Sequence, residues 1–212
     1  MTSTKAFRLG LIGHPVSHSK SPEIFREKFD REGFSNASYE LFDLTNLDNF
    51  GAWIKQQANA DIPLLGFNVT VPHKTQIIPF LTTISAEAQA IQAVNTVVVS
   101  RDPITHEIQL HGHNTDADGF AKSLEIVNEM MIAKLHPQDV LQTPPDSLQI
   151  GSIASNNTLG EFNNPILSNP LNQAIILGNG GSAKAVQHIL NRQNIPHFTL
   201  QRGRILETNT PL

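Results

Sequence analysis

The chain has 212 residues, a formal net charge of −4 at pH 7, 39% hydrophobic residues and no cysteine. Its acidic balance argues against nucleic acid or an anionic membrane as a partner, because both favour a basic protein face. The lack of cysteine excludes thiolate nucleophiles, disulfides and cysteine metal sites. No signal peptide is visible, and no apolar run approaches the roughly 18 residues that span a bilayer, so a cytoplasmic protein is predicted.

Apolar runs alternate with amphipathic stretches along the first 135 residues, which predicts strands and helices in turn. Ser21 is expected to cap the first helix, Pro22 to stand at its first position and Gly33 to end it. Strands are predicted at 7–13, 37–44, 64–71, 94–100 and 107–113. Further helices are predicted at 47–57, 74–81, 85–92 and 116–135.

This alternation predicts an α/β fold with a mainly parallel sheet covered on both faces. Residues 1–114 form the expected first domain, and 115–135 form a helix that connects it to the rest of the chain. The asparagine- and proline-rich stretch 136–173 has no lysine or arginine up to residue 172 and reads as a flexible insertion. Residues 174–212 are expected to form an incomplete Rossmann-type domain.

This last region predicts one βαβ unit, with strands at 174–178 and 197–201 and a helix at 184–193. The remaining residues are too few for another strand–helix pair. We therefore expect the edge of the strand at 197–201 to be uncovered, and an uncovered edge invites pairing with another chain.

Three polar motifs lie where apolar, β-branched runs end: N-V-T-V-P-H-K at 68–74, A-V-N-T at 93–96 and N-T-D at 114–116. Strand tips of a parallel sheet are where α/β proteins bind small molecules, so these motifs predict a site for a hydroxylated ligand. Lys74 and Asp116 are the residues expected to move a proton there. The alternatives are a structural salt bridge, or Asp116 as a cap of the long helix.

The sequence G-N-G-G-S-A at 178–183 fits G-x-G-x-x-A between a predicted strand and helix, a context that indicates dinucleotide binding. Gly178 permits the tight turn, and Gly180 lets backbone amides approach a pyrophosphate. No carboxylate stands at the end of the next strand, where Arg202 and Arg204 suit a phosphate and favour NADP. An ordinary glycine turn and two solvated arginines are the alternatives.

Two polar clusters lie outside these motifs. Ser19 and Ser21 precede a helix, where hydroxyls and amides can hold a carboxylate, although Ser21 could act only as a cap. His111 and His113 share one face of a strand, but no third metal ligand stands at a recognisable spacing. No metal site is therefore predicted.

Together these motifs resemble the shikimate/quinate dehydrogenase family, in family order over about residues 7–125 and 174–202. The resemblance implies NADP-dependent interconversion of 3-dehydroshikimate and shikimate in aromatic amino-acid biosynthesis. It implies catalysis by Lys74 with Asp116. The residues implied to bind substrate are Ser19, Ser21, Thr70, Asn95 and Asp116, and those implied to bind the cofactor are Gly178, Asn179, Gly180, Gly181, Ser182 and Arg202.

The chain departs from the family pattern in three places. The family's N-R-T segment is Q-R-G at 201–203, which removes a threonine hydroxyl near the expected NADP phosphate. The stretch before the glycine loop is longer than usual. The family also continues past this point, so a C-terminally truncated enzyme is expected, with a non-catalytic shikimate-binding module or remnant as the alternative. A homodimer remains open.

Overall fold

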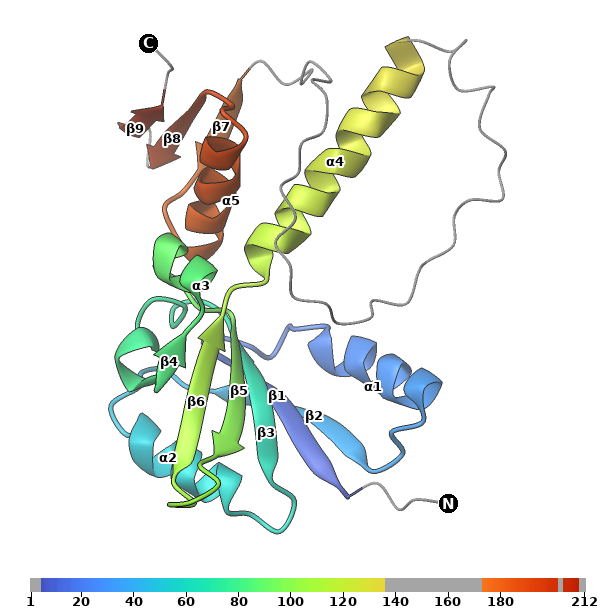
Figure 1. The fold of residues 1–212 in the computed structure, drawn as a ribbon, viewed down its shortest axis with the longest axis vertical. Helices are drawn as coiled ribbons and strands as arrows, with labels where there is room; N and C mark the ends of the chain where they lie inside the picture. The colour runs from blue at the N-terminus through green and yellow to red at the C-terminus, as the bar shows by residue number, and fades with distance from the viewer. Residues whose placement is uncertain (1–4, 136–172, 202–203, 210–212) are drawn as a thin grey trace.

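A computed structural model describes residues 5–135, 173–201 and 204–209. Within these ranges the chain forms a six-stranded sheet in the order β2-β1-β3-β5-β6-β4 and a three-stranded sheet in the order β7-β8-β9 (Figure 1). The first sheet comprises β1 (Phe7–Gly13), β2 (Ala37–Asp43), β3 (Leu64–Val69), β4 (Thr83–Ile84), β5 (Thr96–Arg101) and β6 (Ile108–His113). The second comprises β7 (Ala174–Leu177), β8 (His197–Gln201) and β9 (Arg204–Asn209).

The first sheet is mainly parallel, as the sequence predicts. Strand β1 pairs in parallel with β2 and β3, and β4 pairs in parallel with β6. Strand β5 is the exception, because it runs antiparallel to both β3 and β6. The β5–β6 hairpin follows from the short turn between these strands, since a parallel connection needs a crossover of a dozen or more residues.

Helices cover both faces of this sheet. Helix α1 (Ser21–Glu32) packs against β2, where Phe25 stacks on Tyr39. Helix α2 (Phe50–Ala58) places Trp53 against Phe42 of the same strand. Tyr39 and Phe42 are three residues apart on a strand, so they point to opposite faces, and the two helices therefore lie on opposite sides.

The apolar core lies between α2 and the sheet. Ile12, Leu64 and Ile77 are completely buried there, and Phe67 packs edge-on against Phe50. Helix α3 (Ala86–Ile91) closes the carboxyl end of the core through Ala88, and Ser85 Oγ caps this helix by accepting from the Ala88 N–H. The sheet is thereby a rigid platform for the residues at its strand tips.

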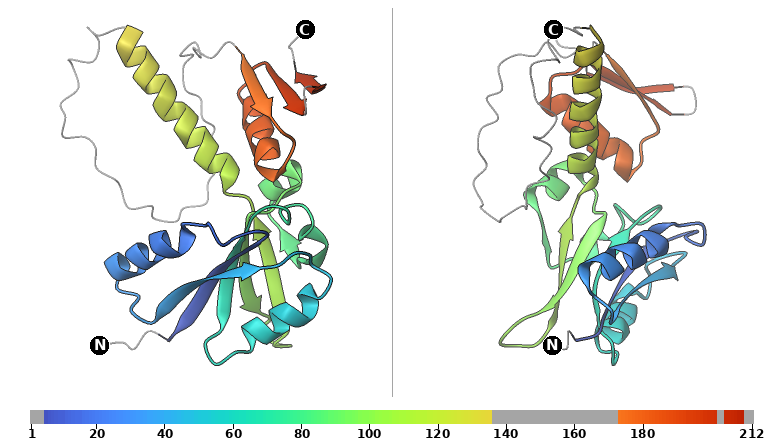
Figure 2. Two further views of the ribbon diagram at one scale, coloured as in Figure 1. Left: turned by 180° about the vertical axis from the view of Figure 1, so that it is seen from behind. Right: turned by 90° about the vertical axis from the view of Figure 1, so that its right-hand side faces the viewer.

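The second sheet packs on the first domain through helices. Helix α4 (Asp116–Leu135) leads away from β6, and α5 (Gly181–Arg192) contacts both α4 and α3 (Figures 1 and 2). A buried cluster joins Ile91 and Ala93 to Ala117, Ala185 and Ile189. In the described ranges, no helix is both long and apolar enough to cross a bilayer.

Strand β9 corrects the expectation of an uncovered edge. Residues 204–209 pair antiparallel with β8, from Gln201 opposite Arg204 to His197 opposite Asn209. A hairpin needs only a short turn, so these residues cover the edge of β8 without another helix. The flexible insertion predicted at 136–173 lies outside the described residues, except for Gln173.

Two local predictions are wrong. Residues 71–77 form turns, and only a short 3₁₀ helix, Ile78–Phe80, follows, because Pro79 removes a backbone donor that an α-helix over 74–81 would need. Ser21 is the first residue of α1 rather than its cap. The Ser21 N–H instead donates to Ser19 Oγ at 3.2 Å.

Candidate active site

Lys74 and Asp116 meet where the turn after β3 faces the first turn of α4. Lys74 Nζ donates to Asp116 Oδ2 at 2.6 Å and to Ser182 Oγ of α5 at 2.8 Å. The Lys74 and Asp116 side chains are 12% and 29% exposed, so water screens this charge pair less than it screens a surface pair. The structure thus brings together Lys74 and Asp116, the two residues expected to move a proton at the ligand site. The Ser182 hydroxyl, from the glycine loop, also contacts this pair.

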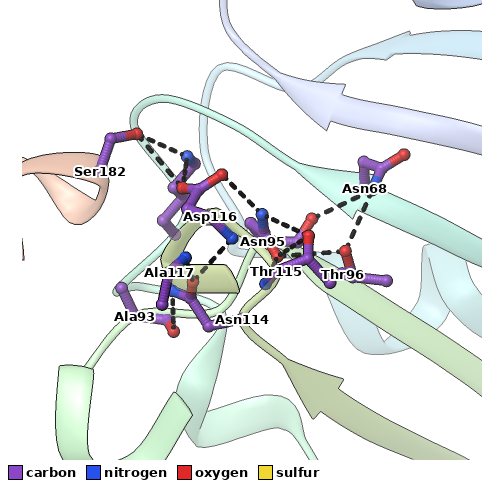
Figure 3. Close-up of polar contacts among 10 residues, drawn as sticks. Asn68, Ala93, Asn95, Thr96, Asn114, Thr115, Asp116, Ala117 and Ser182 are labelled. Atoms are coloured by element: carbon purple, nitrogen blue, oxygen red, sulfur yellow. Dashed lines mark hydrogen bonds and ion pairs between the residues drawn. The ribbon is translucent and has the colours of Figure 1, made fainter. Parts of the chain in front are cut away.

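The second oxygen of Asp116 is held by Asn95, at the start of β5 (Figure 3). Asn95 Nδ2 donates to Asp116 Oδ1 at 2.8 Å, while Asn95 Oδ1 accepts from the Thr115 N–H at 2.9 Å. The backbone N–H can only donate, so it fixes which way round the Asn95 amide lies. Each carboxylate oxygen of Asp116 therefore has its own donor.

Asn114, rather than Asp116, caps helix α4. Asn114 Oδ1 accepts from the N–H groups of Asp116 and Ala117 at 3.0 and 3.3 Å, and Nδ2 donates to the Ala93 carbonyl at 2.9 Å. The side chain is buried, at 4% exposed. The alternative of Asp116 as helix cap is thereby excluded, and its carboxylate is left to Lys74 and Asn95. Sequence reasoning missed this role of Asn114, although N-T-D before a helical run contains the cap signal.

The serine pair lies after β1, at the start of α1. Ser19 Oγ donates to Ser21 Oγ at 3.1 Å. Tyr39 OH donates to Asn68 Oδ1 at 2.8 Å. Asn68 begins the predicted motif at 68–74, whereas Tyr39 belongs to no predicted motif. Thr70 follows β3 and packs its methyl group beside Gly13. Among the described residues, no hydrogen bond joins the Thr70 hydroxyl to the Lys74–Asp116 pair.

Burial raises the pKa of Tyr39 from 10.0 to about 12, and a hydrogen bond from the Ser21 side chain partly opposes this rise. The folded state therefore favours the neutral phenol, and this contribution to stability is fully present below pH 10 and lost as the pH rises toward 12. Tyr39 is the only tyrosine, so tyrosinate absorbance reports it alone. We expect the native protein to titrate near pH 12 and the denatured protein near pH 10; coincident curves would contradict this.

The glycine loop before α5 has a shape that suits a diphosphate. Gly178 has a φ of 101°, and a side chain at Gly178 or Gly180 would point into open space. Gly180 caps α5 without any side-chain hydrogen bond, so the first N–H groups of the helix are not covered by a cap. These residues fit a phosphate-bearing cofactor. Arg202, expected to hold the phosphate of NADP, lies outside the described residues.

Gly181 brings the glycine loop onto the stem of Lys74. A Cβ at Gly181 would lie 2.8 Å from Lys74 Cβ and 2.9 Å from Lys74 Cδ, whereas one at Gly180 would meet nothing within 4 Å. Because Lys74 Cβ moves only with the backbone, we expect Gly181→Ala to destabilise the ligand-free chain by about 1–3 kcal/mol. Gly180→Ala is the matched control and should stay within about 0.5 kcal/mol in denaturant titrations. Equal losses for the two variants would refute the contact.

Two surface hollows of about 160 and 240 Å³ lie away from this site, one beside Leu64 and Arg101 and one beside Asp43 and Trp53. Beside Lys74, Ser182 and Gly181 of the glycine loop lie against its side chain. His111 places its ring nitrogens against the hydroxyls of Thr83 and Ser100. Within the described part of the chain, no three histidine or acidic side chains gather as metal ligands would.

Part of the chain matches a known protein family. Residues 11–97 match the family described as the shikimate dehydrogenase substrate binding domain. Over part of its length the chain is similar to shikimate dehydrogenases. Shikimate dehydrogenase (NADP(+)) of Caldanaerobacter subterraneus subsp. tengcongensis is 42% identical over 130 residues, covering 60% of this chain and 41% of that protein. The enzyme of Shouchella clausii is 31% identical over 188 residues, covering 88% of this chain and 51% of that protein.

Solved shikimate dehydrogenases share the fold. The enzyme of Aquifex aeolicus superposes with a TM-score of 0.61 at 28% identity, over 95% of this chain and 58% of that one. The Thermus thermophilus enzyme, in complex with NADP(H) and shikimate, gives 0.58 at 27% identity, over 92% and 56% of the two chains. The present chain thus spans about half the length of the curated shikimate dehydrogenases it matches.

Proposed function

We propose that this chain binds shikimate and takes part in the NADP-dependent, reversible reduction of 3-dehydroshikimate to shikimate. One observation carries the proposal: Lys74 and Asp116 form a half-buried pair that Ser182, from the glycine loop, also contacts. A proton-transfer pair and a diphosphate loop that touch each other suit a carbonyl reduction, which needs a proton and a hydride at neighbouring atoms.

In this proposal Lys74 acts on the substrate oxygen. Its ammonium has three N–H groups, and within the described residues two of them donate to Asp116 and Ser182. The third is available to donate to the substrate carbonyl. As the carbonyl carbon accepts a hydride, its oxygen takes the proton from Lys74, and oxidation of the alcohol reverses both transfers. NADPH, when bound, supplies the hydride.

The remaining roles follow from the chemistry of each side chain. Asp116 holds the ammonium in place and, with Asn95, offers oxygen and amide groups to ring hydroxyls. Ser19 and Ser21 would hold the substrate carboxylate beside the start of α1, with Thr70 contacting a ring hydroxyl. Gly178, Asn179, Gly180, Gly181 and Ser182 would hold the cofactor diphosphate through the N-terminus of α5, and Arg202 its adenosine phosphate.

The same proposal assigns parts of the chain. Residues 1–114 are the substrate domain, 115–135 connect it to the rest, and 174–212 contribute to the NADP domain. The protein would act in the cytoplasm. Sedimentation of the purified chain would test whether it forms a homodimer.

Two measurements on the purified chain test the function. Calorimetry with shikimate should show binding, and adding NADP with shikimate should raise the absorbance of the reduced nicotinamide. A heat of binding without a change in absorbance would support shikimate binding and contradict catalysis. That result is expected of a binding module. The absence of both signals would overturn the proposal.

A further inference from the structure

A series of hydrogen bonds connects Tyr39 with the Lys74–Asp116 pair, and the Tyr39 ring packs on α1, the helix that begins with Ser21. The series runs from Tyr39 OH to Asn68 Oδ1 at 2.8 Å, from Asn68 Nδ2 to Thr96 Oγ1 at 3.1 Å, from Thr96 Oγ1 to Asn95 Oδ1 at 3.1 Å, and from Asn95 Nδ2 to Asp116 Oδ1 at 2.8 Å.

The direction of these bonds is fixed at Asn68. Asn68 Nδ2 faces the backbone carbonyl of Asn95 at 3.3 Å, and a carbonyl can only accept. The NH₂ group of Asn68 must therefore lie on that side, and its oxygen on the side of Tyr39 (Figure 3 shows the Asn68–Thr96–Asn95 part). Since the Asn68 oxygen can only accept, the Tyr39 phenol must donate to it.

Packing holds the phenol in this position. The Tyr39 ring stacks on Phe25 of α1, with ring centroids 4.2 Å apart and planes 17° from parallel. Tyr39 itself belongs to β2, while Asn68 belongs to β3 on the far side of β1. One side chain thus ties together the helix that carries Ser21 and two strands of the sheet.

We infer that Tyr39 is a positioning residue for shikimate recognition. Its hydroxyl sets the distance between the serines that would hold the carboxylate and the Asn68–Asn95–Asp116 cluster that would hold ring hydroxyls. This role rests on the proposed function, because it needs a ligand with a carboxylate at one end and hydroxyls at the other. Removing the hydroxyl leaves Asn68 Oδ1 without its donor and breaks the hydrogen bond that joins β2 to β3 across β1.

Calorimetry with shikimate on three proteins tests this role: the unaltered chain, Tyr39→Phe and Phe34→Leu. Tyr39→Phe keeps the ring and its stack on Phe25 but removes the hydroxyl, and we expect shikimate affinity to fall about tenfold, the effect of one lost hydrogen bond. Phe34→Leu is the control, because Phe34 belongs to the same aromatic cluster through Phe7 and Phe29 without touching Tyr39. It should lower the melting temperature and leave the affinity unchanged.

Unchanged affinity in Tyr39→Phe would overturn the role, as would an equal loss in Phe34→Leu, which would indicate packing alone. If the unaltered chain does not bind shikimate, the proposed function fails first and the role of Tyr39 fails with it. Should Tyr39→Phe not fold, the unaltered chain labelled with ¹³C at its single tyrosine supplies the answer. Saturating shikimate should shift the phenol carbon resonance, and an unmoved resonance would count against the role.

Discussion

Under the proposed function, replacing Lys74 with alanine in a full-length equivalent should lower kcat for NADP-dependent oxidation of shikimate by about 10²–10⁴-fold, the range for losing a positioned general acid–base group. KM should change much less, because Asn95, Thr70 and the serine pair, rather than Lys74, supply most of the expected contacts to the substrate. Initial rates of NADPH formation across a range of shikimate concentrations separate the two parameters.

Lys122→Ala is the matched control for this prediction. Lys122 is an exposed residue of α4, the helix that begins with Asp116, so its loss removes the same charge near the site without touching the pair. We expect wild-type kinetics from it. If Lys74→Ala instead raises KM and leaves kcat intact, Lys74 binds substrate without transferring a proton. A similar fall in both variants would point to a general charge effect.

Most of the first sheet is predictable from sequence because its strands are short apolar runs bounded by turn residues. The expected strands at 7–13 and 107–113 agree with β1 and β6 to within a residue. The helix expected at 74–81 does not form, because Pro79 interrupts the segment and the Lys74 carbonyl accepts from the Val94 N–H at 2.7 Å instead. Strand β4, of two residues, exists only through its pairing with β6, which local sequence does not encode.

The residues of the site also divide into those that the sequence predicts and those that it does not. Strand ends meet at one edge of a parallel sheet, so motifs 42 residues apart could be expected to bring Lys74 and Asp116 together. Tyr39 carries no comparable signal, because its partner Asn68 lies two strands away and tyrosine is common in strands. Ser182 was expected to bind cofactor, and its contact with Lys74 depends on how the two sheets pack. Sequence patterns predict which reactive side chains lie at turns after strands. They do not predict which hydrogen bonds join elements that are far apart in the chain.

Leu64→Ala should destabilise the first sheet by about 2–5 kcal/mol, the cost of a cavity in a well-packed core. Leu64 is completely buried on the central strand β3, in the cluster that includes Ile12 and Phe67. The same strand delivers Asn68 to the site, so the loss should also weaken shikimate binding. Trp53, the only tryptophan, packs against Phe67 and reports this core by its fluorescence during denaturant titration.

Leu65→Ala provides the matched comparison, because it makes the same change at the next residue of the same strand. Leu65 is 45% exposed, at the irregularity where the pairing of β3 with β1 shifts register. Truncating it removes little buried surface, and we expect a loss below about 1 kcal/mol. If both variants keep the m-value of the unaltered chain, the difference between their free energies of unfolding measures the effect of burial alone. Equal losses would mean that the two leucines are buried to the same extent, contrary to the structure.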